Sequence, residues 1–374
     1  MTSYLPYGHQ WIDDDDMAAV ADVLSGDWLT QGPAIEAFER SVADYVGVAH
    51  AVAFCNGTAA LHGAYHAAGV RAGDEVIVPP LTFAATANAA CFLGACPVFA
   101  DIAPATFCLD PAEVARKVTA KTKVVAPVSY AGHPADVAGC RRAAPGAVVV
   151  EDGCHALGGD RSGLKVGAEA DMTVFSFHPV KPVTTGEGGM VVTNDGRFAE
   201  RLRLFRSHGI TKDPAWMEAK DEGPWYYEMI DLGFNYRMTE FQAALGESQM
   251  KKLDAFVARR RELASRYDEA FAGQDGVVAP PHHEGHAYHL YPIQVAPARR
   301  RGLFEGLRAA SIGVQVHYIP VHLHPYYRRH FGYGGGDFPV AEAFYGGEIS
   351  LPLFPAMEDE DVSRVVDAVT GLLS

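Results

Sequence analysis

Short apolar runs alternate with helical stretches along the first half of the chain. Two helical patterns come first. One follows the acidic run Asp13–Asp16, which suits a solvated helix start, and the other covers residues 34–45. Apolar runs then fill residues 51–54, 75–78, 97–99, 123–128 and 147–151, with helical periodicity between them at 59–68, 84–93, 111–117 and 135–144. This spacing is typical of βαβ units. It predicts an α/β fold with a mostly parallel sheet, helices on both faces, and ligands at the carboxyl ends of the strands.

The pattern changes in the second half. The predicted strands at residues 172–175 and 190–192 are joined by a loop and not by a helix. Beyond them we expect a helix at 197–206, a loop around 225–228, one long helix at 239–267, strands at 290–295 and 314–318, and a helix at 359–373. Because 374 residues exceed what one core usually supports, we expect a large domain over residues 1–255 and a smaller C-terminal α+β domain over 256–374.

Composition excludes several classes of function. The 46 acidic and 31 basic residues give a formal net charge of −15, which argues against a nucleic-acid or anionic-membrane partner. No run approaches about eighteen apolar residues and the amino terminus lacks a secretory signal, so we expect no membrane helix and a cytoplasmic location. The six cysteines show no CxxC pair or zinc spacing, which fits reduced thiols in that compartment.

The loop between residues 176 and 189 holds a lysine between two prolines. Pro179 and Pro182 fix φ and remove two amide donors, so the backbone that carries Lys181 is stiff before tertiary contacts form. A lysine aimed from a strand end into apolar surroundings has its pKa lowered by desolvation, which makes the neutral amine available as a nucleophile or general base. On this segment alone, a surface lysine on a polar turn is an equal alternative.

Three further loops follow predicted strands. Asn56–Leu61 offers bare amides and a hydroxyl at a helix amino terminus, which can bind an anion, although such a turn more often only caps a helix. Asp152 ends a very apolar strand, where it would pair with a cationic ring nitrogen or cap a helix. His155 would bond a ring hydroxyl or a core carbonyl, and Phe83 would stack on a flat ring or belong to the core.

The C-terminal third is rich in histidine, which raises the possibility of a metal site. Zinc spacing with a closing carboxylate is absent, so we expect no metal and interpret these residues as unligated. His317 is set apart by the resemblance described next. The histidines concerned are His282, His283, His286, His289, His317, His322 and His324.

In chain order, the sequence holds a phosphate turn, a stacking aromatic, an acid after a strand and a fixed lysine. This order resembles the fold-type I pyridoxal phosphate enzymes, in particular the DegT/DnrJ/EryC1/StrS nucleotide-sugar aminotransferase family. The likeness runs nearly end to end, and is greatest to the members that make UDP-4-amino-4,6-dideoxy-N-acetyl-β-L-altrosamine for pseudaminic acid. The segments that carry it are Trp28–Gly32, Ser176–Gly189, Leu204–Gly209, Phe234–Met238, Val316–Pro320 and Glu348–Pro352.

The resemblance implies pyridoxal 5′-phosphate as the cofactor, with pyridoxamine phosphate as its second form during turnover. Lys181, Asp152 and His155 would be catalytic: Lys181 would join the cofactor aldehyde, Asp152 would face the pyridine nitrogen, and His155 would lie near the ring hydroxyl. The other cofactor-binding residues would be Phe83 on the ring and Gly57, Thr58, Ser176 and, from the neighbouring subunit, Asn235 on the phosphate. The family often has Ser-Gly or Asn-Ser where this chain has Asn56-Gly57.

The implied reaction transfers the amino group of L-glutamate to C4 of a UDP-linked 4-keto-6-deoxy-N-acetylhexosamine, in a homodimer with shared active sites. A sister aminotransferase for another UDP- or dTDP-linked 4-keto or 3-keto sugar is the main alternative. A sugar dehydratase of the same fold would have histidine at Lys181, and a non-catalytic regulator would lose Lys181 or Asp152. The sugar-nucleotide site would be lined by Tyr7, Asp27, Trp28, Leu29, Thr30, Val316, His317, Tyr318 and Ile319.

Overall fold

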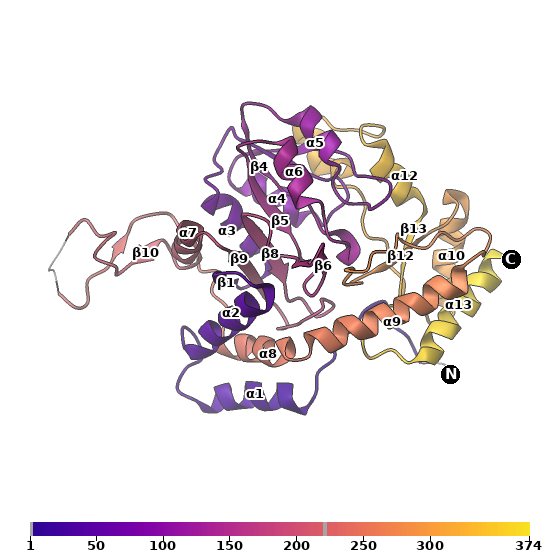
Figure 1. The fold of residues 1–374 in the computed structure, drawn as a ribbon, viewed down its shortest axis with the longest axis horizontal. Coiled ribbons are helices and arrows are strands. Elements are labelled where there is room, and N and C mark those ends of the chain that lie inside the picture. The colour runs from indigo at the N-terminus through magenta and orange to yellow at the C-terminus, as the bar shows by residue number, and fades with distance from the viewer. Residues whose placement is uncertain (1–2, 220–222) are drawn as a thin grey trace.

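A seven-stranded sheet forms the centre of the computed structural model, which describes residues 3–219 and 223–374 (Figure 1). β9 is antiparallel to both of its neighbours, β1 and β8, whereas every other neighbouring pair is parallel. Six strands of this sheet therefore point the same way, which confirms the mostly parallel arrangement. In spatial order the strands are β1 (His50–Phe54), β9 (Gly189–Thr193), β8 (Met172–Ser176), β5 (Val148–Asp152), β4 (Thr122–Val125), β2 (Glu75–Val78) and β3 (Cys96–Phe99).

Alternate residues of the strands feed a hydrophobic core on each face of the sheet, because side chains alternate along a strand. Val191 packs with α3, α4 and α7, whereas its neighbours Met190 and Val192 pack with α2. Ile77 and Val125 meet α5 and α6 on that second face. The helices are α2 (Pro33–Val46), α3 (Gly57–Ala67), α4 (Ala85–Phe92), α5 (Pro111–Lys117), α6 (Val137–Ala143) and α7 (Gly196–Arg206).

The single long helix predicted at residues 239–267 is wrong: the chain forms α8 (Glu240–Met250) and α9 (Leu253–Phe271). At the turn between them, Lys252 Nζ lies 3.0 Å from the carboxylate of Asp16 in α1 (Asp14–Ser25). Asp16 is buried and not solvated as predicted, and it also accepts a hydrogen bond from Gln249 at 2.6 Å. The break thus depends on contacts with α1, and no glycine or proline signals it at the turn.

The C-terminal residues build a second core. Leu263 and Tyr267 of α9 pack there against β12, β13, α10 and α13. The strand predicted at residues 314–318 is wrong, because only Gln315 makes a bridge, to Ser350, and the next amides leave the sheet edge. Both chain ends lie beside this core in Figure 1. The elements of this core besides α9 are β12 (Tyr291–Gln294), β13 (Glu348–Leu351), α10 (Pro297–Ala309) and α13 (Asp359–Leu373). The remaining helices, which pack with the core of the large sheet, are α11 (Pro325–Phe331), α12 (Pro339–Gly347) and two short 3-10 turns, Tyr130–Gly132 and Val321–Leu323.

Two short hairpins are present in the part of the chain that the structure describes. The segment predicted as a loop at residues 225–228 ends in a paired strand, since Glu228 and Met229 pair with Ile210 and Thr211. This hairpin projects from the body of the molecule in Figure 1. The hairpin strands are β10 (Ile210–Thr211) with β11 (Glu228–Met229), and β6 (Asp160–Arg161) with β7 (Leu164–Lys165).

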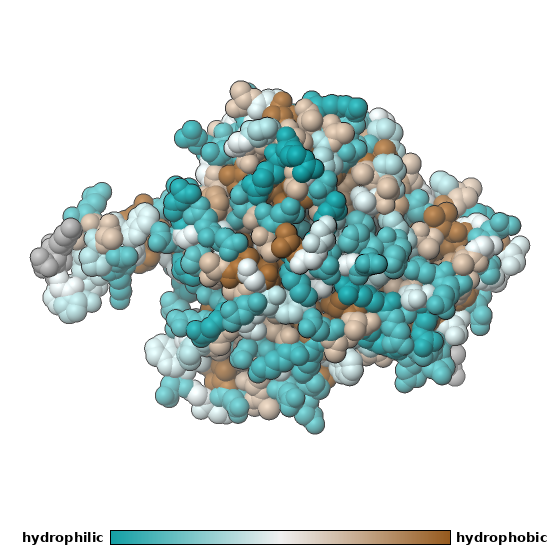
Figure 2. Space-filling model, in the orientation of Figure 1, coloured by the Kyte–Doolittle hydropathy of each residue, from teal (hydrophilic) through white to brown (hydrophobic). Residues whose placement is uncertain are grey.

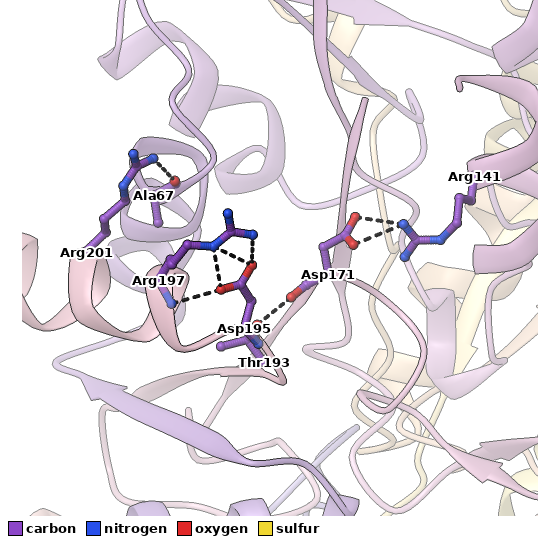
Figure 3. Close-up of polar contacts among 7 residues, drawn as sticks. All are labelled: Ala67, Arg141, Asp171, Thr193, Asp195, Arg197 and Arg201. Carbon is purple, nitrogen blue, oxygen red and sulfur yellow. Dashed lines mark hydrogen bonds and ion pairs between the residues drawn. The ribbon is translucent and has the colours of Figure 1, made fainter. Parts of the chain in front are cut away.

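Polar contacts connect the strand ends where β8 begins and β9 ends (Figure 3). Arg141 of α6 donates to both carboxylate oxygens of Asp171 at 3.0 Å, and that carboxylate also accepts from the Val149 amide at 2.8 Å. The Thr193 hydroxyl donates to the Asp171 carbonyl at 2.6 Å. These bonds connect α6, β5, β8 and β9. They fix the register of the central strands at the end of the sheet opposite the carboxyl ends of β5 and β8.

On the face drawn in Figure 2, hydrophilic residues predominate and apolar ones form small separate groups. No helix within residues 3–219 and 223–374 is long and apolar enough to cross a membrane.

Candidate active site

A cavity of about 620 Å³ opens at the carboxyl ends of the strands. Its wall is built by the residues that follow β1, β2, β4, β5 and β8, together with segments 289 and 315–318 from the C-terminal part of the chain. Its size suits a cofactor or a small substrate. The site thus lies where the parallel strands predicted it.

Lys181 projects into this cavity from the loop between β8 and β9. A turn closed by the Lys181 amide on the His178 carbonyl at 2.9 Å holds the loop. Burial lowers the pKa of Lys181, and the nearby Cys154 and Asp152 partly oppose that shift. Lys181 Nζ lies 3.4 Å from Nε2 of His289. The surface-lysine alternative is therefore excluded, and the amine is available as a nucleophile.

Asp152 ends β5 as a buried carboxylate in a chain of hydrogen bonds. The Thr86 hydroxyl donates to Asp152 Oδ2 at 2.6 Å, and Thr82 donates in turn to Thr86 at 2.8 Å. Oδ1 accepts from the Cys154 amide at 3.2 Å, and a turn, not a helix, follows. Asp152 therefore caps no helix, and its buried charge faces a cavity with room for a cation.

His155 is held in one neutral form by its two partners. Its Nδ1 accepts the Ala131 amide at 3.2 Å, which leaves the proton on Nε2, 3.1 Å from the Tyr318 hydroxyl. Burial keeps its pKa well below the usual value, with Lys181 adding to the shift. His155 thus donates toward the cavity through Nε2, and its bond to an amide replaces the core carbonyl considered from sequence.

The first turn of α3 faces Ser176 across a close gap. Asn56 caps the helix by accepting the Ala59 amide at 2.8 Å, so the amides of Gly57 and Thr58 have no intrahelical acceptor. A Cβ on Gly57 would lie 3.0 Å from Cβ of Ser176, so a larger residue at this position would force Ser176 to move. Free amides, a hydroxyl and the positive end of a helix dipole suit a phosphate.

Phe83 lines the same cavity with 59% of its surface exposed, so it is not a core residue. Its ring centroid lies 5.9 Å from that of Tyr318. An exposed aromatic wall, a buried acid, a buried amine and an anion cradle together fit pyridoxal phosphate. Lys181 would hold its aldehyde, Asp152 its ring nitrogen and the start of α3 its phosphate.

The predicted sugar-site residues fall into two groups. Tyr7, Val316, His317 and Tyr318 line the cavity, whereas Ile319 is exposed outside the lining. The loop of Asp27, Trp28, Leu29 and Thr30 is exposed and outside the lining, as is Asn235, which bridges to Ser207.

Four residues to which sequence reasoning gave no role stand out: Thr86, which bonds Asp152, and Thr82, Glu187 and His289, which line the cavity. His289 was considered only as part of a histidine-rich run. Thr82 and Thr86 lie close to Phe83 in the sequence and Glu187 lies in the lysine loop, but none of the three was assigned a role. No local signal marks Thr86 or His289, because the residues that they contact, Asp152 and Lys181, come from distant segments.

A sequence model described as the DegT/DnrJ/EryC1/StrS aminotransferase family matches residues 10–370. The spore coat polysaccharide biosynthesis protein SpsC of Bacillus subtilis is 41% identical over 379 residues, covering 99% of this chain and 97% of SpsC. Among solved structures, Helicobacter pylori PseC, an aminotransferase of pseudaminic acid biosynthesis, has a TM-score of 0.92 at 34% identity over 99% of both chains. Streptococcus pneumoniae Spr1654 in its PLP form has a TM-score of 0.91 at 29% identity, over 99% and 98%.

Proposed function

Because the chain belongs to the DegT/DnrJ/EryC1/StrS aminotransferase family and is a pyridoxal phosphate-dependent enzyme, we propose that it aminates C4 of a UDP-linked 4-keto-6-deoxy-N-acetylhexosamine. L-Glutamate is the proposed amino donor, and UDP-4-amino-4,6-dideoxy-N-acetyl-β-L-altrosamine the product, for pseudaminic acid. The likeness to PseC along the whole chain carries this choice of sugar. Six free thiols, typical of a reducing compartment, support a cytoplasmic location.

The proposed roles follow from the positions of the side chains. Bound pyridoxal phosphate supplies an electron sink and carries the amino group between the two substrates. Lys181 Nζ, with its pKa lowered by burial, takes and returns a proton as a neutral amine. Asp152 would hold positive charge at the ring nitrogen, and Phe83 would cover one face of the ring. Gly57, Thr58 and Ser176, which line the cavity, would bind the phosphate.

Product analysis tests the reaction. The protein loaded with pyridoxal phosphate should be yellow, should bleach with L-glutamate, and should convert the UDP-linked keto sugar to an amino sugar identified by mass and proton NMR. Lys181→Ala should lower turnover by more than about 10²-fold. The control Lys165→Ala removes a lysine that contacts Tyr45, outside the cavity, and should keep activity. Turnover retained by Lys181→Ala would sink the assignment.

A second candidate is amination of another nucleotide sugar. SpsC is 41% identical to this chain and is described as a protein of spore coat polysaccharide biosynthesis. Parallel assays with UDP- and dTDP-linked 4-keto and 3-keto sugars discriminate the two. A preference for a dTDP-linked sugar would support the sister activity and reject the UDP-sugar proposal.

We further propose a homodimer in which Asn235 completes the phosphate site of the neighbouring subunit. Two observations support it: Asn235 lies exposed outside the cavity of its own chain, and Phe234 beside it and Leu232 are exposed apolar residues. Mixing inactive Lys181→Ala with Asn235→Ala protein after subunit exchange should restore activity, because one site per mixed dimer has both native residues. No restoration would contradict shared sites.

A further inference from the structure

Three buried side chains beside the cavity form a continuous hydrogen-bonded chain. Ser350 Oγ lies 2.6 Å from Glu348 Oε1 and 2.9 Å from Nδ1 of His317. The other carboxylate oxygen, Oε2, accepts the backbone amide of His317 at 2.8 Å. Glu348 and Ser350 are fully buried and His317 is 7% exposed. The three residues therefore form one hydrogen-bonded chain that is largely shielded from bulk water.

The fold holds this chain in place from two segments. Glu348 and Ser350 lie two residues apart on β13, so both side chains leave the same face of the strand. The bridge between Gln315 and Ser350 sets the register of the facing segment. The Tyr130 hydroxyl donates to the His317 carbonyl and fixes it from the other side. His317 lines the cavity, and its Nε2 has no hydrogen-bond partner among the residues that the structure describes.

Two proton arrangements fit the same heavy-atom positions. With Glu348 ionised, Ser350 donates to Oε1, His317 donates from Nδ1 to Ser350, and Nε2 is an acceptor toward the cavity. With Glu348 protonated on Oε1, that proton is donated to Ser350, Ser350 donates to Nδ1, and the imidazole proton moves to Nε2. The imidazole is neutral in both arrangements, and one proton has passed between Nε2 and the carboxyl group.

We propose that Glu348, Ser350 and His317 form a proton relay that lets His317 present either a donor or an acceptor to the bound substrate. When Nε2 takes a proton from a substrate group, Nδ1 passes its proton to Ser350 and Ser350 passes its own to Glu348. The reverse sequence returns the proton, so charge and protons balance in both directions. Glu348 and Ser350 are positioning residues that act through His317.

The surroundings favour a relay over a charged imidazole. Burial, and then Lys181, lowers the pKa of His317 to about 3, so the ring stays neutral while protons pass through it. Burial raises the pKa of Glu348 to about 8, although hydrogen bonds from Ser350 and His317 and the charge of Arg300 oppose the rise. The carboxyl group can therefore gain or lose a proton near neutral pH.

Other titratable groups face the relay. Tyr7 and Tyr318 have rings 5.3 and 4.9 Å from that of His317, and Tyr130 and Tyr318 interact with the charge of Glu348. Burial raises the pKa of all three phenols above 10, so they stay neutral where Glu348 titrates. Lys181 is the cation whose charge lowers the pKa of His317, as stated above. His155 and His289 also interact with His317, and burial keeps the pKa of both well below the usual value, so they stay neutral where Glu348 titrates.

The position of the imidazole proton tests the relay directly. Protein labelled with ¹⁵N-histidine and loaded with pyridoxal phosphate is studied by long-range proton–nitrogen NMR, with His317→Asn to assign the signal. The proton should be on Nε2 at pH 6.5 and on Nδ1 at pH 9.5, with a midpoint near 8. One unchanged tautomer over this range overturns the proposal, whichever sugar the enzyme uses.

Two variants separate the relay from simple packing. Glu348→Gln keeps an acceptor for the His317 amide and can only donate to Ser350, so it should hold the proton on Nε2 at every pH. Ser350→Ala removes the connecting hydroxyl and should abolish the pH-dependent switch. In kcat/KM for the amino acceptor, both variants should lose the ionisation near pH 8.

Glu151→Gln is the matched control. Glu151 is an equally buried carboxyl group bonded by two hydroxyls, from Ser129 and Thr173, and has no link to His317. It should leave both the His317 tautomer switch and the ionisation near pH 8 intact. A wild-type pH response in Ser350→Ala, or loss of the response in Glu151→Gln, would refute the relay.

Discussion

Asp152 receives its hydrogen bond from a threonine that is itself held by a second threonine. The Thr86→Val substitution keeps the shape of this fully buried side chain but removes the donor to Asp152 Oδ2. Since hydrogen bonds to charged groups contribute most, we expect the free energy of unfolding to fall by about 1.5–3 kcal/mol. Urea unfolding measures this loss, and the affinity for pyridoxal phosphate should fall with it because Asp152 is less well oriented.

Thr82→Val provides the comparison for that experiment. It removes the bond between the two hydroxyls and leaves the donor to Asp152 in place. The expected loss is about 0.5–1.5 kcal/mol, the range for a neutral hydrogen bond. If both variants lost the same stability, the carboxylate would not be the source of the effect.

At the level of single residues, sequence alone identified the groups that carry their own local signal. Lys181 stands between prolines and Asp152 ends an apolar strand, so both stood out as candidates, and the resemblance to the aminotransferase family supplied their roles. His289 and Thr86 gave no such signal, because each contacts a partner far away in the chain: Lys181 is 108 residues from His289, and Asp152 is 66 residues from Thr86. Such partners become visible only when the chain is folded.

At the level of elements, α2 is capped from a distant helix. Gly32 at its N-cap has no side chain, and Glu240 of α8 accepts the amides of Gly32 at 2.9 Å and Ala34 at 2.7 Å. Glu240→Gln leaves one oxygen to serve both amides and removes the charge that the helix dipole favours. We expect a loss of about 0.5–2 kcal/mol in the free energy of unfolding, measured by urea denaturation.

Glu247→Gln is the control on the same helix. Its carboxylate pairs with Lys251 at the surface, 3.4 Å away, where ion pairs contribute little. The expected change is within about 0.5 kcal/mol. A loss as large as that of Glu240→Gln would show that α8 itself, and not the cap on α2, had been weakened.

The elements that sequence predicted well are those whose own periodicity decides them. The strands and helices of the βαβ region are of this kind, since each strand contains a run of buried apolar residues. The helix break after Met250 and the loss of the strand at 314–318 depend on side chains elsewhere. In the second case the His317 amide bonds to the Glu348 carboxylate instead of a strand.

For the whole molecule, the pH dependence of stability is set by two kinds of buried group. Burial lowers the pKa of His62 and His133 to about 4 and that of His317 to about 3, so below pH 6.5 the unfolded chain binds protons that the native state does not. Burial raises the pKa of Glu151 to about 7 and that of Glu348 to about 8, so above pH 4.5 the native state binds the extra protons. The first group makes stability rise with pH and the second makes it fall.

Because the histidines stop contributing above pH 6.5, the free energy of unfolding should pass through a maximum near that pH and fall toward pH 8. Urea unfolding between about pH 5 and 8.5 gives the curve. Glu151→Gln should make the fall above pH 6.5 shallower, since one of the two carboxyl groups no longer titrates. An unchanged slope in that variant would mean that Glu151 does not hold its proton in the native state.

α9 belongs to both hydrophobic cores. Leu253 and Val257 at its start pack with α2 and the sheet, whereas Leu263 and Tyr267 pack with the C-terminal strands. The domain boundary predicted after residue 255 falls inside this helix. The two parts are therefore not independent of each other. In a chimera of two relatives joined after residue 255, the two halves of α9 would come from different proteins and would not match each other's packing partners. A chimera joined in the connection after Phe271 would keep α9 intact.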